Sequence, residues 1–213
     1  ALLVLECVAD ALKYAWDTRS IIHCDVKPDN VLVDADGSVK VSDLGLARTL
    51  SAMTRAEEEV DEVLGTPYYM SPEQAQGLAD LDFHSDIYSL GAMLFHMLTG
   101  QIPFHDQDVE SVMELQVTTD LPPVRDINPD VSVEAAALVK RMTEKSPGDR
   151  QHDWEEVLKD VADVKSKKNV RKVGSTDTMR LLKRRNQISR IQGKSRHKFI
   201  GTLIVLFAVT AAI

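Results

Sequence analysis

Between two apolar stretches near the start of the chain lies the polar octapeptide His23-Cys24-Asp25-Val26-Lys27-Pro28-Asp29-Asn30. The carboxylate of Asp25 and the cation of Lys27 are two residues apart, close enough to act on one phosphoryl group. Asn30 adds a neutral carbonyl oxygen, which is a ligand that hard cations accept. The octapeptide therefore carries a carboxylate, a cation and a metal ligand within one short segment.

The sequence after the octapeptide predicts a β-hairpin. Val31–Val33 and Val39–Val41 are short runs of β-forming residues, and the segment between them contains Asp36-Gly37, a pair typical of tight hairpin turns. Asp43 follows the second run, so the hairpin would fold its carboxylate back beside Asn30. Phosphoryl transfer requires a carboxylate that orients the attacking hydroxyl, oxygen ligands for Mg²⁺ and a cation near the transferred phosphate. The octapeptide and the hairpin together can supply all three.

Most of the remaining pattern is helical. Residues 1–19 repeat apolar side chains at spacings of three and four, which predicts one buried helix. From Asp86 onward a second apolar stripe ends at Gly100, a residue type that commonly follows a helix C-terminus. Further helices are predicted over Val133–Met142 and Trp154–Val164. The predicted fold class is therefore α+β and mainly α-helical, with one small β-hairpin.

The charge of the chain is divided between two regions. Of 213 residues, 25 are Lys or Arg and 33 are Asp or Glu, so the net charge is −8. Residues 165–198 contain 13 Lys or Arg and the single acid Asp177, a local charge of +12, which leaves −20 for the rest. An acidic globular part argues against nucleic-acid binding, and the basic strip indicates a local anionic partner. The two cysteines, Cys7 and Cys24, do not indicate a disulfide framework.

The end of the sequence predicts a membrane segment. Residues 199–213 contain no charged side chain, and a spanning helix needs about twenty such residues. The basic strip before them fits the positive-inside rule, which would place the globular part in the cytoplasm and the strip near anionic head groups. We expect a globular domain over residues 1–164, a basic juxtamembrane linker over 165–198 and a truncated single-pass transmembrane helix over 199–213. We also expect both ends of the chain to be cuts, since it opens inside one apolar pattern and stops inside another.

Five motifs occur in the order in which protein kinases carry them. The octapeptide resembles the catalytic loop H-R-D-L-K-x-x-N, Asp43-Leu44-Gly45 resembles D-F-G, and Ser71-Pro72-Glu73 resembles A-P-E. Residues 86–91 resemble the central helix of that family, and Arg150 resembles its late arginine. Over residues 1–164 the chain is thus similar to the large C-terminal lobe of bacterial membrane-anchored serine/threonine protein kinases.

The resemblance implies roles for the residues nearest the reaction. Asp25 would be the catalytic base, and Lys27 would contact the transferred phosphate. Asn30 and Asp43 would bind Mg²⁺ and, with Lys27, position ATP. The implied reaction moves the γ-phosphate of ATP to Ser or Thr hydroxyls of protein substrates, because a lysine at position 27 is the serine/threonine form of this loop.

The same resemblance implies five supporting residues. His23 would brace the loop, and Thr66 would steady the base from the segment that meets the substrate. Asp86 would hold the catalytic-loop backbone from below. Glu73 and Arg150 would form a buried ion pair that ties the substrate-side segment to the lobe.

The sequence departs from the family pattern at three points. Cys24 replaces an arginine that pairs with a phosphorylated residue, so we expect activity to depend little on phosphorylation of Thr49, Ser51 or Thr54. Leu44 replaces a phenylalanine, which is a mild apolar change. Nothing in the sequence resembles the Gly-rich loop, the β3 lysine or the helix glutamate of the N-terminal lobe. We therefore expect this chain by itself to transfer no phosphate.

A membrane-tethered pseudokinase or scaffold module is the alternative function. The retained Asp25, Lys27, Asn30 and Asp43 argue against it, because a protein without catalysis has no need of them. A missing N-terminal lobe would favour it only if the native protein also lacks that lobe.

Overall fold

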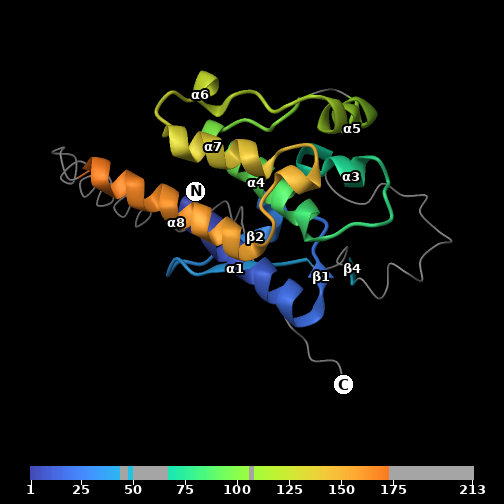
Figure 1. Cartoon of the computed structure of the whole chain (residues 1–213), viewed down its shortest axis with the longest axis horizontal. Coiled ribbons are helices and arrows are strands. Elements are labelled where there is room, and N and C mark those ends of the chain that lie inside the picture. The colour runs from blue at the N-terminus through green and yellow to red at the C-terminus, as the bar shows by residue number, and fades with distance from the viewer. Residues whose placement is uncertain (44–47, 50–66, 106–107, 173–213) are drawn as a thin grey trace, which may run out of the picture.

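The computed structural model describes residues 1–43, 48–49, 67–105 and 108–172 (Figure 1). Some sequence-based expectations concern residues outside these ranges, namely Leu44, Gly45, Ser51, Thr54, Thr66 and the apolar end 199–213. In the part of the chain that the structure describes, no helix is both long and apolar enough to span a bilayer. The membrane segment therefore stays a prediction.

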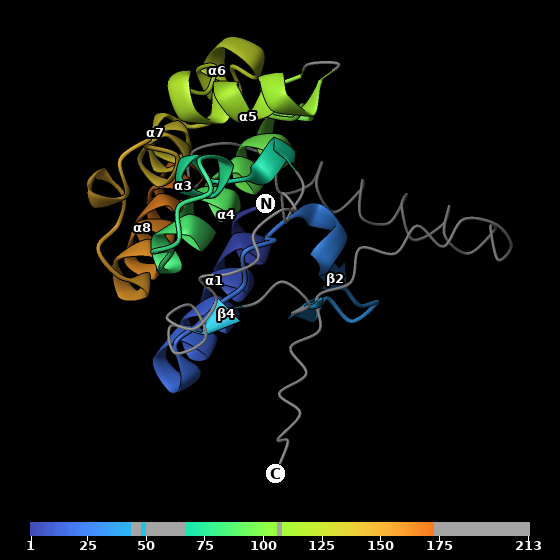
Figure 2. The same cartoon turned by 90° about the vertical axis from the view of Figure 1, so that its right-hand side faces the viewer.

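The described residues form a mainly helical fold with two small antiparallel sheets, which confirms the predicted α+β class. The elements in chain order are α1 (Leu2–Arg19), β1 (Ile21–Ile22), η1 (Pro28–Asn30), β2 (Val31–Val33), β3 (Val39–Val41), β4 (Arg48–Thr49), η3 (Pro67–Tyr69), α3 (Pro72–Ala75), α4 (Phe83–Thr99), α5 (Val109–Thr118), α6 (Val124–Ile127), α7 (Val133–Met142), η4 (Pro147–Asp149) and α8 (Trp154–Lys172). Two perpendicular views place α5 and α6 at one end of the molecule and α1 with the sheets toward the other (Figure 1, Figure 2).

Helix α4 is the centre of the fold. Every residue from Ser85 to Phe95 is buried, which requires neighbours on all sides, and α4 packs against α1, α6, α7 and η3. At Gly91 its backbone approaches α7 so closely that an added Cβ would lie 2.6 Å from Cβ of Met142. The helix ends at Gly100, whose φ of 74° lies in the left-handed region that glycine adopts readily.

Helix α1 buries the apolar face that its spacing predicted. The buried residues are Leu5, Val8, Ala9, Leu12 and Ala15. Two ion pairs connect the helix to α8, one between Lys13 and Glu155 at 2.6 Å and one between Glu6 and Lys165 at 2.5 Å. The chain leaves α1 through Ser20, which has a left-handed φ of 50°, and turns directly into β1. The octapeptide therefore starts directly after the buried Ile22.

Helix α8 continues past Val164, where the sequence pattern predicted its end, to Lys172. Val157, Val161 and Val164 are the buried apolar residues that the pattern detected. Beyond them the apolar repeat stops, but the backbone stays helical and Lys165 still contacts α1. Hydrophobic periodicity marks only the packed part of a helix, so the predicted boundary after residue 164 falls inside α8.

The hairpin of β2 and β3 has the predicted strands. Val31 pairs with Val41 across an antiparallel ladder. The pairing extends one residue further, because the Ser42 N–H donates to the Asn30 carbonyl at 3.0 Å. Asp43 directly follows, so the hairpin brings its backbone next to that of Asn30. A second small sheet pairs β1 with β4, which returns the chain after Asp43 to the strand that precedes the octapeptide.

Candidate active site

A carboxylate beneath the octapeptide holds its first two residues. The His23 N–H donates to Asp86 Oδ2 at 2.8 Å, and the Cys24 N–H donates to Asp86 Oδ1 at 2.9 Å. Asp86 lies in the first turn of α4 and is buried. Burial raises the pKa of the Asp86 carboxyl, while His23 and the two N–H groups oppose that rise. These contacts attach the octapeptide to α4, whose residues from Ser85 to Phe95 are all buried.

The ring of His23 connects the octapeptide to the end of the hairpin. Nδ1 accepts the Asp25 N–H at 3.3 Å, and Nε2 lies 3.1 Å from the carbonyl oxygen of Ser42. When Nδ1 accepts, the proton of the neutral ring is on Nε2, which then donates to Ser42. Because Ser42 directly precedes Asp43, one buried ring links the backbone at the predicted base to the backbone at the predicted metal ligand.

Three of the residues assigned to the reaction meet at one carboxylate. Lys27 Nζ lies 2.6 Å from Asp25 Oδ2, and Asn30 Nδ2 donates to the same oxygen at 3.0 Å. Asn30 Nδ2 also donates to the main-chain oxygen of Asp25 at 2.8 Å. Asp25 is only 8% exposed, so these partners replace much of the water that would otherwise solvate its charge.

The remaining oxygen groups fit a magnesium ion. The amide nitrogen of Asn30 donates a hydrogen bond to Asp25, so the amide oxygen of Asn30 is the atom that can coordinate a metal. Asp43, at the end of the hairpin, is exposed and adds a carboxylate. Mg²⁺ is usually bound by one or two such protein groups together with phosphates and waters. The described residues contain no group of three or more His, Cys, Asp or Glu that could hold a metal.

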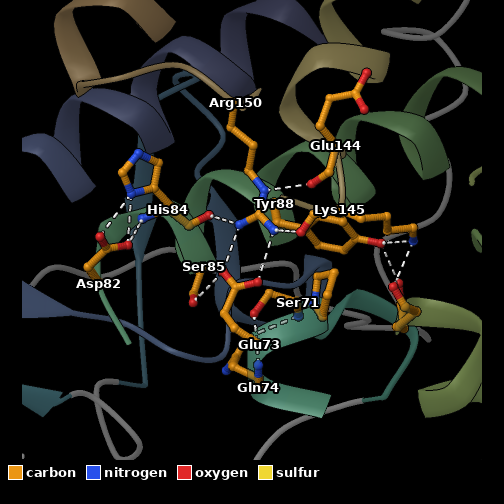
Figure 3. A network of polar contacts seen from close by, with 12 residues as sticks. Ser71, Glu73, Gln74, Asp82, His84, Ser85, Tyr88, Glu144, Lys145 and Arg150 are labelled. Carbon is orange, nitrogen blue, oxygen red and sulfur yellow. Dashed lines mark hydrogen bonds and ion pairs between the residues drawn. The ribbon is translucent and has the colours of Figure 1, made fainter. Parts of the chain in front are cut away.

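A buried arginine organises the neighbouring segment, as Figure 3 shows. Arg150 Nη1 and Nη2 lie 2.7 and 2.9 Å from the two carboxylate oxygens of Glu73. Its other N–H groups donate to the carbonyls of His84, Glu144 and Lys145 at 2.8, 2.8 and 3.0 Å. All five donors of the guanidinium are thus paired at 0% exposure. This bidentate ion pair fixes α3 against α4 and the turn before η4.

A second polar network, which was not predicted from the sequence, supports the chain at η3, shortly before α3. Lys145 Nζ donates to the Tyr88 hydroxyl at 3.0 Å and to the Gln116 carbonyl at 2.7 Å. The Tyr88 hydroxyl donates to Gln116 Oε1 at 2.7 Å, and Gln116 Nε2 donates to the Pro67 carbonyl at 3.0 Å. Burial lowers the pKa of Lys145 to about 8 and raises the pKa of Tyr88. Tyr88 lies in the motif of residues 86–91, but no local pattern marks Gln116 or Lys145, which come from α5 and from the turn before η4.

Gln74 was also missed, although a local signal existed. Its N–H donates to Ser71 Oγ at 3.2 Å, and the Ser71 N–H donates to Gln74 Oε1 at 3.1 Å. These two bonds form a capping box at the start of α3, for which the spacing Ser-x-x-Gln is a sequence signature. The signature predicts the cap but not the further bond from Gln74 Nε2 to the Cys24 carbonyl, at 2.7 Å.

Bacterial serine/threonine kinases resemble this chain over three quarters of its length. PrkC, the serine/threonine-protein kinase of Bacillus subtilis, is 36% identical over 162 residues, which are 76% of this chain and 24% of that protein. PknB, the serine/threonine-protein kinase of Mycobacterium leprae, is 38% identical over 165 residues, which are 76% of this chain and 26% of that protein. A probable serine/threonine-protein kinase of Clostridium perfringens is 36% identical over 163 residues, which are 76% of this chain and 23% of that protein.

The chain therefore spans about a quarter of the length of these relatives. Residues 2–161 match the protein kinase domain, a match that covers well over half of the chain. Every residue of the site, from His23 to Arg150, falls inside that match. With this coverage and the order of its motifs, the chain belongs to the protein kinase family.

Proposed function

We propose that the protein that carries this chain is a serine/threonine protein kinase, which transfers the γ-phosphate of ATP to Ser or Thr hydroxyls of proteins. The observation that supports this most directly is the cluster in which Lys27 and Asn30 both contact Asp25 Oδ2, beside the hairpin end that carries Asp43. A carboxylate, a cation and two metal ligands are the groups that phosphoryl transfer requires. The names of the bacterial relatives support the serine/threonine substrate class.

Each residue of the cluster has a defined task in that reaction. Asp25 orients the substrate hydroxyl and accepts its proton. Lys27, with its Nζ 2.6 Å from the Asp25 carboxylate, places a positive charge where the hydroxyl and a phosphate would meet. Asn30 keeps Asp25 oriented through its amide nitrogen and, with Asp43, offers oxygen to a metal. Bound ATP with Mg²⁺ would supply the phosphoryl group and the charge that stabilises the leaving group.

Replacement of the base tests the proposal. Asp25→Asn keeps the shape of the side chain but removes its ability to accept a proton. In the native protein we expect kcat to fall by about 10²–10⁴-fold, with little change in the KM for ATP. The control is Asp36→Asn in the exposed hairpin turn, which should leave kcat unchanged. Both are measured as transfer of labelled phosphate from ATP to a protein that contains Ser and Thr.

Two results would count against the proposal. An Asp25→Asn protein as active as the Asp36→Asn control would remove Asp25 from the reaction. Complete absence of transfer by the native protein would favour the alternative function, a pseudokinase or scaffold module.

We also propose that the basic strip and the apolar end attach the protein to a membrane, with the kinase domain on the cytoplasmic side. The support is the sequence pattern: 13 Lys or Arg against one acid over residues 165–198, followed by a stretch without charge over 199–213. The native protein should then sediment with membranes and resist extraction by high salt. If high salt releases the protein, the basic strip alone attaches it to the membrane. If the protein is recovered in the soluble fraction at low salt, the proposal is contradicted.

A further inference from the structure

We propose that Gln74 is a positioning residue for the catalytic loop, because its amide holds the carbonyl of Cys24 and thereby sets the direction of Asp25. The inference rests on the proposed function, since Asp25 acts as a base only if the protein transfers phosphate. It adds a link between α3 and the octapeptide that none of the kinase motifs in the sequence indicates.

Both polar main-chain groups of Cys24 are held by side chains from other elements. The N–H donates to Asp86 of α4 at 2.9 Å, and the carbonyl accepts from Gln74 Nε2 at 2.7 Å. These partners lie 62 and 50 residues further along the chain. The peptide groups on both sides of Cys24 are therefore fixed, and the second of them carries the N–H of Asp25.

The backbone of Cys24 needs this support. Its φ of 64° lies in the left-handed region that residues other than glycine rarely adopt, at a cost of about 1–2 kcal/mol. Without a partner for the Cys24 carbonyl, the peptide before Asp25 could rotate toward a more common conformation. That rotation would break the bond from the Asp25 N–H to His23 Nδ1 and turn the carboxylate away from Lys27.

The side chain of Gln74 is itself held in place. Its Oε1 accepts the Ser71 N–H at 3.1 Å in the capping box, and this bond orients the amide so that Nε2 is aimed at Cys24. The preceding residue, Glu73, is bonded to Arg150 (Figure 3). Gln74 thus connects the catalytic loop to α3, the helix that also carries Glu73 of the buried ion pair.

Gln76 offers a matched control, because it is the same residue type two positions later. Its Nε2 donates to the Pro72 carbonyl at 3.0 Å, a bond of the same kind that stays within the turn of α3. The substitutions Gln74→Glu and Gln76→Glu both remove an amide donor and add a negative charge. In Gln74→Glu one oxygen can still accept the Ser71 N–H, so the capping box is retained. Only Gln74→Glu removes a bond to the catalytic loop.

Kinetics of the native protein test the catalytic consequence. We expect Gln74→Glu to lower kcat by about tenfold or more, since small misplacements of a reacting group are costly. The KM for ATP should stay near the wild-type value, and Gln76→Glu should match wild type in both constants. A Gln74→Glu protein with the kcat of Gln76→Glu would overturn the inference. A rise in the KM for ATP as large as the loss in kcat would also overturn it, because it would indicate general damage to the site.

Hydrogen exchange at the Asp25 amide tests the structural part without relying on catalysis. In the 213-residue chain we expect this amide to exchange about tenfold faster in Gln74→Glu than in wild type, and unchanged in Gln76→Glu. Equal exchange in all three proteins would refute the positioning role. If the native protein transfers no phosphate, the proposed function fails, and the exchange rate alone decides whether Gln74 positions the loop.

Discussion

The substitution Glu73→Gln tests how much the segment beside the catalytic loop depends on its buried ion pair. Arg150 is 0% exposed and the Glu73 side chain 8%, and the two are joined by bonds of 2.7 and 2.9 Å. The substitution preserves the size of the side chain and keeps one acceptor oxygen. In the wild-type chain Ser85 Oγ donates to Glu73 Oε1 at 2.9 Å. The substitution removes the negative charge and places an amide NH₂ against the guanidinium of Arg150.

The expected loss of stability is about 3–4 kcal/mol. Two unit charges about 4 Å apart attract each other by about 4 kcal/mol at an effective dielectric constant of about 20. Removing one partner of a buried pair costs about 3–5 kcal/mol, because the other charge stays buried without compensation. The acceptor oxygen that remains offsets part of this loss. With an m-value of about 2 kcal/mol per molar urea, the unfolding midpoint should fall by about 1.5–2 M.

Tryptophan fluorescence in urea measures this midpoint, since Trp154 is buried in the folded chain and becomes hydrated on unfolding. The control is Asp34→Asn, which removes an ion pair with Lys40 in the exposed hairpin turn. Exposed pairs contribute little, so the control should keep the wild-type midpoint. If Glu73→Gln lowers the midpoint no further than Asp34→Asn does, the buried ion pair contributes no more to stability than an exposed one.

Two further substitutions test the packing of α4 and the buried lysine. Gly91→Ala should destabilise the chain by about 1–3 kcal/mol, because the new Cβ would lie 2.6 Å from Cβ of Met142. Gly148→Ala, whose nearest neighbour is 4.0 Å away, should melt at the wild-type temperature, and equal melting of both variants would contradict this. Burial lowers the pKa of Lys145 from 10.5 to about 8, so the unfolded chain binds more protons between these pH values. The stability of wild type relative to Lys145→Met should therefore rise with pH across that window, and a constant difference in urea titrations would refute it.

Local patterns in the sequence determined much of the fold. Helices α1 and α7 and the β2–β3 hairpin have the positions that apolar spacing and Asp36-Gly37 predicted, because each signal lies within the element itself. Helix α5 was not predicted, since only Val112 and Gln116 of its residues are buried and one of them is polar. The end of α8 was placed too early because the sequence after Val164 lacks the apolar spacing that marked the earlier turns.

The candidate site divides in the same way. Asp25, Lys27 and Asn30 lie within six residues on one loop, so the sequence by itself determined that they would be neighbours. Only the tertiary structure decided that Gln74 would hold the Cys24 carbonyl, 50 residues away, while Gln76 at the C-terminal end of the same short helix would not. The two glutamines have the same hydrogen-bonding groups, and the packing of the helices determines which carbonyl lies within reach of each.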